Sequence, residues 1–171
     1  RTGYYLKKFL NDNLDLVQDE KRLRSWIVFR LAEIYLNYAE AMNEAYGPDA
    51  NNGYALTAKE AINLVRGRTG VEMPAITTAS KEEFREKVKL ERRVELAFEE
   101  HRYWDLRRWK DATTVLNEPL TGVQATKNGN HFSYQVKEVE KRTFTQKMYF
   151  YPIPHSEINK SNGIVKQNPG W

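Results

Sequence analysis

The sequence predicts a helix that carries two glutamates on its apolar side. Glu91 and Glu95 lie one helical turn apart, so both side chains project from the same face. That face also holds apolar side chains that should be buried, namely Phe84, Val88 and Phe98. An ionised carboxylate in an apolar setting costs several kcal/mol unless a cation compensates it. The fold must therefore bring positive charge to this helix.

Three arginines are candidates for that charge. Arg66 and Arg68 stand at the end of a preceding predicted helix, and Arg102 lies further along the same face as the glutamates. Buried charges in proteins are generally paired, which favours a structural role. We therefore expect Glu91 and Glu95 to form an ion-pair frame with these three arginines.

A metal site or acid–base chemistry is the alternative use of paired helix carboxylates, as in di-iron helix bundles. Those sites require a Glu-x-x-His spacing, whereas here His101 follows Glu100 directly and Phe98 stands three residues before it. Phosphate-loop, dinucleotide, serine-hydrolase and zinc-protease motifs do not occur in the sequence. We expect no catalytic residue, no metal, no cofactor and no enzyme activity.

Composition and charge set further limits. The 171 residues are 40% hydrophobic and 29% charged, which suits one globular domain or one piece of a larger domain. Cysteine is absent, so disulfides and thiolate chemistry are excluded. The Arg- and Trp-rich stretch before Lys110 is neutralised by Glu99–Arg102 and Asp105–Arg108 at i,i+3 spacing, which argues against nucleic-acid binding. No apolar run approaches the ~20 residues that span a bilayer.

Two shorter helices should form an antiparallel pair ahead of the glutamate helix. The first should span about Ser25 to Tyr46 and end at Gly47-Pro48. The second should run from about Ala58 to Arg66, after a Thr57–Glu60 capping box. The buried face predicted for the first helix consists of Leu31, Ile34, Tyr35, Tyr38, Met42 and Ala45. The pair has the size of a tetratricopeptide-like unit, and about three such units are needed for a continuous core. We therefore interpret the chain as a fragment.

The remaining elements are less regular. The glutamate helix should begin at a second capping box, Ser80–Glu83, and run to about Glu100, or to Lys110 with a break near His101. A loop-rich stretch with one possible hairpin turn at Asn128-Gly129 should follow. Residues 147–151 are predicted as a short strand or an extended segment, and the tail from Ser156 as a turn or single helical turn with an extended end.

Several motifs, in order along the chain, carry a resemblance to a known family. The pattern R-x-A-E-x-Y-L-x-x-A-E-A occurs in Arg30–Ala41, and I-N-x-V-R-x-R occurs in Ile62–Arg68. The most specific match is Glu91–Trp109, and the last matches are Ile153-Pro154, Glu157-Ile158 and Gln167–Trp171. Together they resemble the C-terminal part of SusD/RagB outer-membrane nutrient-binding lipoproteins. Two departures are Glu100, where the family usually has Gly, and Asn162-Gly163, where it commonly has Asn-Pro.

The resemblance implies a fold and a function. The fold would be mainly α-helical, with tetratricopeptide-like helix pairs of the α–α superhelix type, a loop-rich region and little strand. Residues 1–171 would form the C-terminal part of one such domain, with the N-terminal portion and the lipid-anchor signal outside this chain. Such proteins bind glycans or other nutrients at the surface of the outer membrane and cap a SusC-like TonB-dependent transporter, with membrane contact only through the lipid anchor.

Ligand contacts cannot be transferred by motif, but residue chemistry offers a hypothesis. Sugars are held by flat aromatic faces and polar groups. His131, Phe132 and Tyr134 in the loop-rich stretch fit this description, although ordinary packing is an alternative role for each. A second hypothesis for the whole chain is a helical-repeat scaffold whose partner is another protein.

Overall fold

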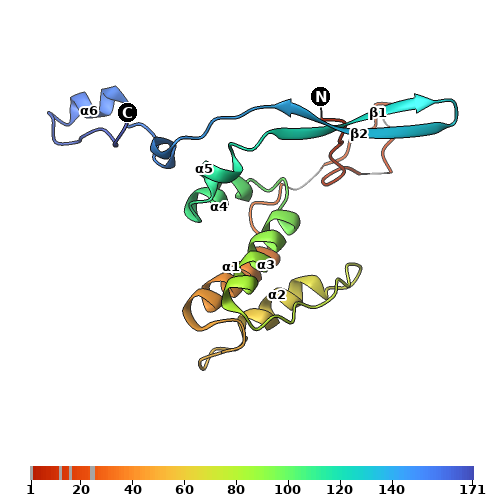
Figure 1. Ribbon diagram of the computed structural model, residues 1–171, viewed down its shortest axis with the longest axis horizontal. Helices are drawn as coiled ribbons and strands as arrows, with labels where there is room; N and C mark the ends of the chain where they lie inside the picture. Colours follow the sequence, from red (N-terminus) through yellow and green to blue (C-terminus); the bar gives the residue numbers. More distant parts are fainter. Residues whose placement is uncertain (1, 12, 16, 24–25) are drawn as a thin grey trace. The chain divides into compact units, whose positions relative to one another are not determined.

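The chain folds into two compact units, seen in a computed structural model that describes residues 2–11, 13–15, 17–23 and 26–171. One unit is Asn11–Arg102; the other combines Arg1–Leu10 with Tyr103–Trp171. Helices α1, α2 and α3 lie in the first unit, and the second contains a β-hairpin with short helical segments (Figure 1). Over the described residues there is one two-stranded sheet. The predicted mainly α fold is confirmed.

Helix α1 spans Leu31–Tyr46 and begins six residues later than predicted. Arg30, the residue before it, is extended with φ −150°, and residues 26–29 are not helical; Ser25 lies outside the described residues. The C-terminal end agrees with the prediction, because Gly47 adopts φ +86° and its N–H donates to the Asn43 carbonyl. The apolar pattern therefore placed the end of the helix correctly and its start too early.

The buried face of α1 differs from the predicted one. Its buried residues are Leu36, Ala39, Met42 and Asn43, whereas Leu31 and Ile34 are exposed. Both α2 and α3 pack against α1, and they do so on the Leu36 side. Apolar residues occupy more than one side of this helix, so hydrophobicity alone could not identify the side that its neighbours cover.

Helices α2, Ala58–Arg66, and α3, Lys81–Glu95, complete the core of this unit. The capping box of α2 forms as predicted, with Thr57 and Glu60 each accepting the other's backbone N–H. At α3 only half of the predicted box forms: Ser80 accepts the Glu83 N–H, but the Glu83 carboxylate binds the Thr78 hydroxyl instead. The core shared by the three helices consists of Leu36, Ala39, Met42, Ala58, Ala61, Ile62, Val65, Ile76, Phe84, Val88 and Leu96.

Helix α3 ends at Glu95, five residues before the earlier of the two predicted ends, Glu100. Residues 96–100 form turns, and α4 begins at His101 and ends at Arg108. Phe98 and Glu100 adopt left-handed backbone conformations, with φ +63° and +67°. Phe98 therefore leaves the helical register and is 65% exposed, which contradicts its predicted place in the buried stripe.

The second unit has its own small core around α4 and the chain's C-terminal third. Leu106 of α4 packs with Ala112 of α5, Ala112–Val115, and with Phe144 and Tyr149. The buried Arg107 donates to the Tyr149 carbonyl and, at 2.5 Å, to the Met148 carbonyl. These contacts hold Gln146–Tyr149 as a 3₁₀-helix, η1. The strand or extended segment predicted at 147–151 is therefore wrong for residues 147–149, whereas Phe150 is extended, with φ −115°. The single helical turn expected near Ser156 is present as α6, His155–Lys160.

An antiparallel hairpin replaces the irregular loops expected after Asp111. Strand β1 spans Leu120–Asn128 and β2 spans His131–Glu140, and Asn128 pairs with His131. The two-residue loop is therefore Gly129-Asn130, one position beyond the predicted turn. Gly129 adopts φ +59°, which glycine accepts at the first position of a type II′ turn. No described helix of the chain has both the length and the apolar character needed to cross a membrane.

Candidate functional site

The C-terminal end of α3 is held by Arg30, which stands directly before α1. Its guanidinium forms a fork with Glu99, Nε to Oε2 at 2.7 Å and Nη2 to Oε1 at 2.9 Å, and its Nη1 donates to Glu95 Oε1 at 2.6 Å. Nη2 also donates to the Glu95 carbonyl at 2.6 Å. Helix C-termini leave carbonyls without intrahelical partners, so Arg30 satisfies one of them while it pairs with two carboxylates.

Arg66 and Arg68 reach the same helix from the end of α2. Arg66 Nη1 pairs with Glu91 Oε2, and Arg68 Nη2 lies 2.9 Å from Glu95 Oε2. The side chains of Glu91 and Glu95 are only 12% and 10% exposed, so both carboxylates are largely removed from water; Arg66 is 16% exposed, whereas Arg68 is 43% exposed. We use the name α3 frame for the acids Glu91, Glu95 and Glu99 together with the arginines Arg30, Arg66 and Arg68.

Electrostatics within the α3 frame favour the charged forms. Burial raises the pKa of Glu95, but hydrogen bonds and charges from Arg30 and Arg68 outweigh burial and leave that pKa below its ordinary value. Burial likewise lowers the pKa of Arg30, and its hydrogen bonds to Glu99 and Glu95 reverse the shift and leave it raised. At neutral pH Glu95 is therefore an ionised, paired carboxylate, which suits a structural ion pair and not a general acid.

Sequence reasoning missed Arg30, and it placed Arg102 on the same helix as the glutamates, which is wrong. The idea that Arg102 shares a face with Glu91 and Glu95 required one continuous helix, but the break at 96–100 puts Arg102 on α4. Arg30, which the sequence did not suggest, supplies a cation to Glu95 from 65 residues away in the sequence. The signal was present, since Arg30 is the first residue of the motif preceding α1, but no local pattern indicates which distant helix it contacts.

A second buried arginine, also missed, joins α3 to α1. Arg92 is 4% exposed, and its Nη1 donates to Asn37 Oδ1 at 2.5 Å while Nε lies 3.9 Å from Glu40. Arg92 comes one residue after Glu91, so the helix places it toward α1 while the glutamates face the arginines from α2 and from the segment before α1. The polar residues Asn37 and Glu40 of α1 therefore contact α3 through Arg92.

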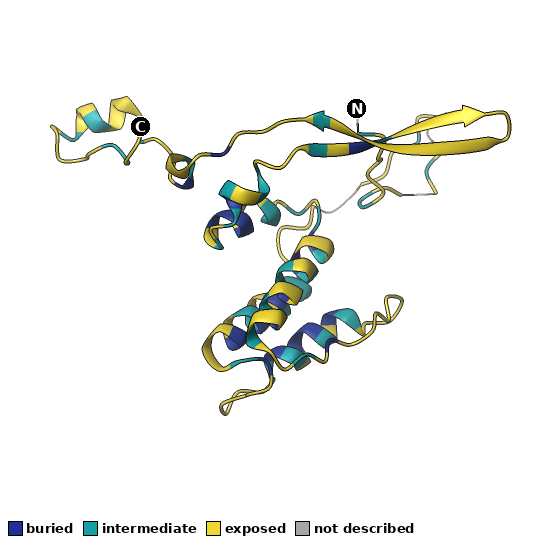
Figure 2. Cartoon of the chain, in the orientation of Figure 1, coloured by how far each residue is buried: buried dark blue, intermediate teal, exposed yellow. Residues whose placement is uncertain are grey.

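The residues predicted to contact glycans lie on the hairpin, and the pleat separates them. Phe132 and Tyr134 project from one face of β2, together with Val136, and are 56% and 69% exposed. His131 projects from the opposite face. Figure 2 shows most of the hairpin exposed, in contrast to the dark inner sides of α1–α3. The structure thus brings two of the three residues together on one open aromatic face.

Metal-ligand chemistry finds no support in the described part of the chain. There, no three His, Asp or Glu side chains lie close enough together to hold a metal ion. The carboxylates of the α3 frame are instead engaged by arginines.

Comparison with known proteins identifies the family to which this chain belongs. The SusD family model matches residues 1–171. This chain belongs to the SusD family. Among curated proteins it is similar to SusD-like protein P25 of Formosa agariphila, with 36% identity over 135 residues, which is 78% of this chain and 24% of that protein.

Solved structures of the SusD family have the same fold. A SusD-like protein from Bacteroides fragilis NCTC 9343 is 38% identical and superposes with a TM-score of 0.71, covering 85% of this chain and 26% of that one. A SusD-like carbohydrate binding protein from the same strain is 35% identical with a TM-score of 0.59, covering 75% of this chain and 26% of that one. The chain therefore spans about a quarter of the length of these relatives.

Proposed function

We propose that this chain forms part of a non-catalytic protein that binds glycans at the cell surface. The observation that carries the proposal is the match of the SusD family model to residues 1–171. It is supported by the similarity, at 35% identity, to a SusD-like protein described as carbohydrate binding. The arginine-paired carboxylates of the α3 frame agree with a role without catalysis, since their charges are engaged in holding helices together.

Delivery to a transporter is the second part of the proposal. By its family, the full-length protein would pass its glycan to a SusC-like TonB-dependent transporter in the outer membrane. A lipid anchor outside this chain would keep the protein at the cell surface. Co-purification of the full-length protein with an outer-membrane transporter supports this part. A soluble partner without any transporter would favour the alternative of a helical-repeat scaffold.

Different residues would perform different tasks within this function. Glu91 and Glu95 with Arg30, Arg66 and Arg68 would fix the helices, and Arg102 would belong to the same framework at the start of α4. Phe132 and Tyr134 would stack on the glycan, because exposed aromatic rings offer flat apolar faces to sugar C–H groups. His131 lies on the opposite face of β2, so it would contribute a polar contact only to a ligand that extends around the edge of the strand to that face.

Affinity electrophoresis and calorimetry of the full-length protein against a glycan panel test the proposal. We expect at least one glycan to bind, and replacing Phe132 and Tyr134 together by alanine should weaken binding about tenfold, roughly the loss of 1.4 kcal/mol of contact. His131→Ala, on the opposite face, is the matched control and should change affinity less than about twofold. Absence of binding across the panel would overturn the proposed function.

A further inference from the structure

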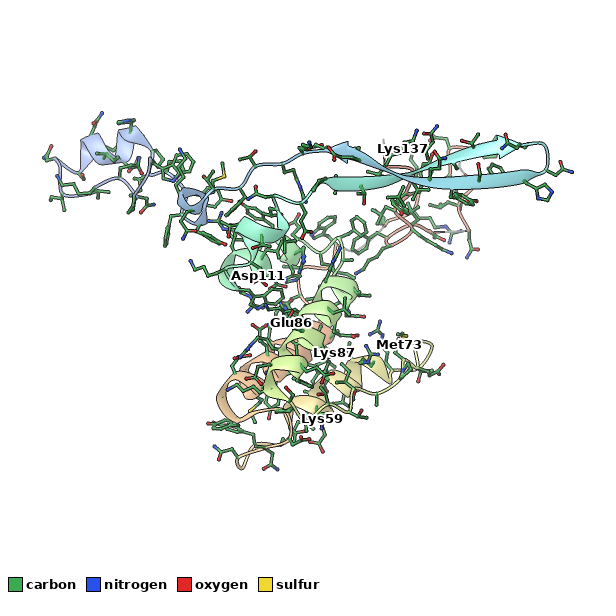
Figure 3. All side chains as sticks on the ribbon, viewed as in Figure 1. Lys59, Met73, Glu86, Lys87, Asp111 and Lys137 are labelled. Carbon is green, nitrogen blue, oxygen red and sulfur yellow. The ribbon has the colours of Figure 1, made fainter. Side chains whose placement is uncertain are left out.

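A polar groove lies beside the α3 frame, between α3 and the connection that follows α2. Its volume is about 470 Å³, within the range of small-ligand sites. One wall is the extended segment 74–78, and the other is the face of α3 that carries Glu83, Lys87 and Glu91. Lys87 is labelled on α3 in Figure 3. The groove lies entirely within the helical unit.

The walls of this groove are held by contacts on both sides. Arg66 donates from Nε to the Pro74 carbonyl at 2.9 Å and pairs with Glu91 through Nη1, so one side chain ties the extended segment to α3. Asn63 holds the next part of the segment, since its side chain bonds both the N–H and the carbonyl of Ile76 at 2.8 and 3.1 Å. The groove is therefore preformed, which lowers the entropic cost of binding.

The charges that line the groove cancel. Arg66 and Lys87 supply two cations, and Glu83 and Glu91 supply two carboxylates. Arg66 is paired with Glu91, and Glu83 Oε2 accepts the Thr78 hydroxyl at 2.7 Å. Such a lining gives no net attraction to an anion or a cation, so an uncharged ligand is favoured.

Hydrogen-bonding capacity remains at the groove surface. Within the described residues, the second oxygen of Glu83 and of Glu91 accepts no hydrogen bond, and Thr77 and Lys87 present a hydroxyl and an ammonium group. Leu90, 55% exposed, adds an apolar patch next to these polar groups. Closely spaced donors and acceptors beside an apolar patch match a ligand that has many hydroxyls and a C–H face.

We propose that this groove binds one sugar unit of a neutral glycan. Glu83, Glu91, Thr77 and Lys87 would bond its hydroxyls, and Leu90 would contact its C–H face. The proposal rests on the proposed glycan-binding function and adds a subsite formed by other residues than the hairpin aromatics. The groove is open and has no aromatic ring among its lining residues, so binding of a single sugar is weak, on the order of millimolar.

Methyl NMR of the full-length protein, titrated with glucose, galactose, mannose and xylose, tests the groove directly. For at least one of these sugars the Leu90 methyl signals should shift to saturation, while those of Leu31, which is 64% exposed on α1, should stay unchanged. Glucuronate should bind no more tightly than the neutral sugar. If no sugar moves the Leu90 signals, or if glucuronate binds about tenfold more tightly, the proposal is wrong.

A blocking variant provides the second readout. Thr77→Trp places a large ring in the groove at an exposed, non-helical position and should abolish the Leu90 shift. Thr69→Trp is the matched control, since Thr69 is exposed in the same connection but does not line the groove. If the sugar still shifts the Leu90 signals in Thr77→Trp, the proposal that the groove binds it is wrong. If a glycan is still retained in affinity electrophoresis while Leu90 never responds, the groove alone is excluded and the proposed function stands.

Discussion

The α3 frame and the β1–β2 hairpin use their side chains in opposite ways. In the frame, Glu91 and Glu95 are nearly buried, and each is paired with arginine from a distant segment. In the hairpin, nearly every residue of β2 is exposed, including the rings of Phe132 and Tyr134. In these two regions, therefore, charged side chains are largely buried and aromatic rings are exposed, although the cores of both units are apolar.

This contrast shows that the type of a residue does not by itself determine whether it stabilises the fold or is available for binding. Buried charges are tolerated only where partners compensate them, so the frame fixes the mutual positions of helices and the segment before α1. Exposed aromatic rings contribute little to the stability of a two-stranded hairpin and remain available for contact with other molecules. Substitutions should therefore affect stability in the first region and binding in the second.

The largest expected effect compares two phenylalanines. Phe84 is fully buried in the core of the three helices. Phe84→Ala should lower the free energy of unfolding by about 3–5 kcal/mol, because it opens a large cavity. Phe132→Ala, on the open hairpin face, should change the free energy of unfolding by less than about 0.5 kcal/mol. Urea unfolding followed by circular dichroism measures both values. Similar losses in the two variants would remove the distinction between the regions.

The next effect concerns the frame itself. Glu95→Ala leaves Arg30 and Arg68 without their shared carboxylate and should destabilise the protein by about 2–4 kcal/mol; the partial exposure of both arginines keeps the loss below that of a fully buried pair. Glu86→Ala, which removes a 68% exposed carboxylate paired with Lys89, is the control and should cost less than about 0.5 kcal/mol. Equal urea midpoints for the two variants would mean that the frame does not hold the helices.

A smaller effect is the pH dependence of the stability that Glu95 contributes. The pKa of Glu95 is lowered in the folded state, so its contribution is complete above the ordinary carboxyl value of about 4.3 and is lost as pH falls through the lower, folded value. The difference in unfolding free energy between the wild-type protein and Glu95→Gln should therefore shrink between pH 7 and pH 3. Parallel urea titrations at several pH values measure that difference. A constant gap would show that Glu95 is not held ionised by its arginines.

The smallest effect is a gain in stability at the helix break. Glu100 is exposed with φ +67°, a conformation that costs a side-chain-bearing residue about 1–2 kcal/mol and glycine almost nothing. Glu100→Gly should therefore stabilise the protein by about 0.5–1 kcal/mol, after allowing for the greater flexibility of glycine in the unfolded chain. Glu86→Gly, inside α3, is the opposite control and should destabilise by about 1 kcal/mol. A loss of stability in Glu100→Gly would contradict the left-handed assignment.

Local chemistry in the sequence determined much of this protein. The Thr57–Glu60 capping box and the Gly47 terminus of α1 were predictable because their causes lie within a few neighbouring residues. The need for cations at Glu91 and Glu95 was predictable too, from the cost of burying charge. The family motifs and the mainly α fold were also read from the sequence alone.

Tertiary structure decided which distant groups meet. Only the packed helices brought Arg30 to Glu95 across 65 residues. Only the break at 96–100 exposed Phe98 and put Arg102 on a helix separate from the glutamates. Only the folding of these residues as strand β2, whose successive side chains point to opposite faces, separated His131 from Phe132 and Tyr134. The physical reason is the same in each case: a periodic pattern shows that a face needs a partner, but the identity of the partner depends on how the whole chain packs.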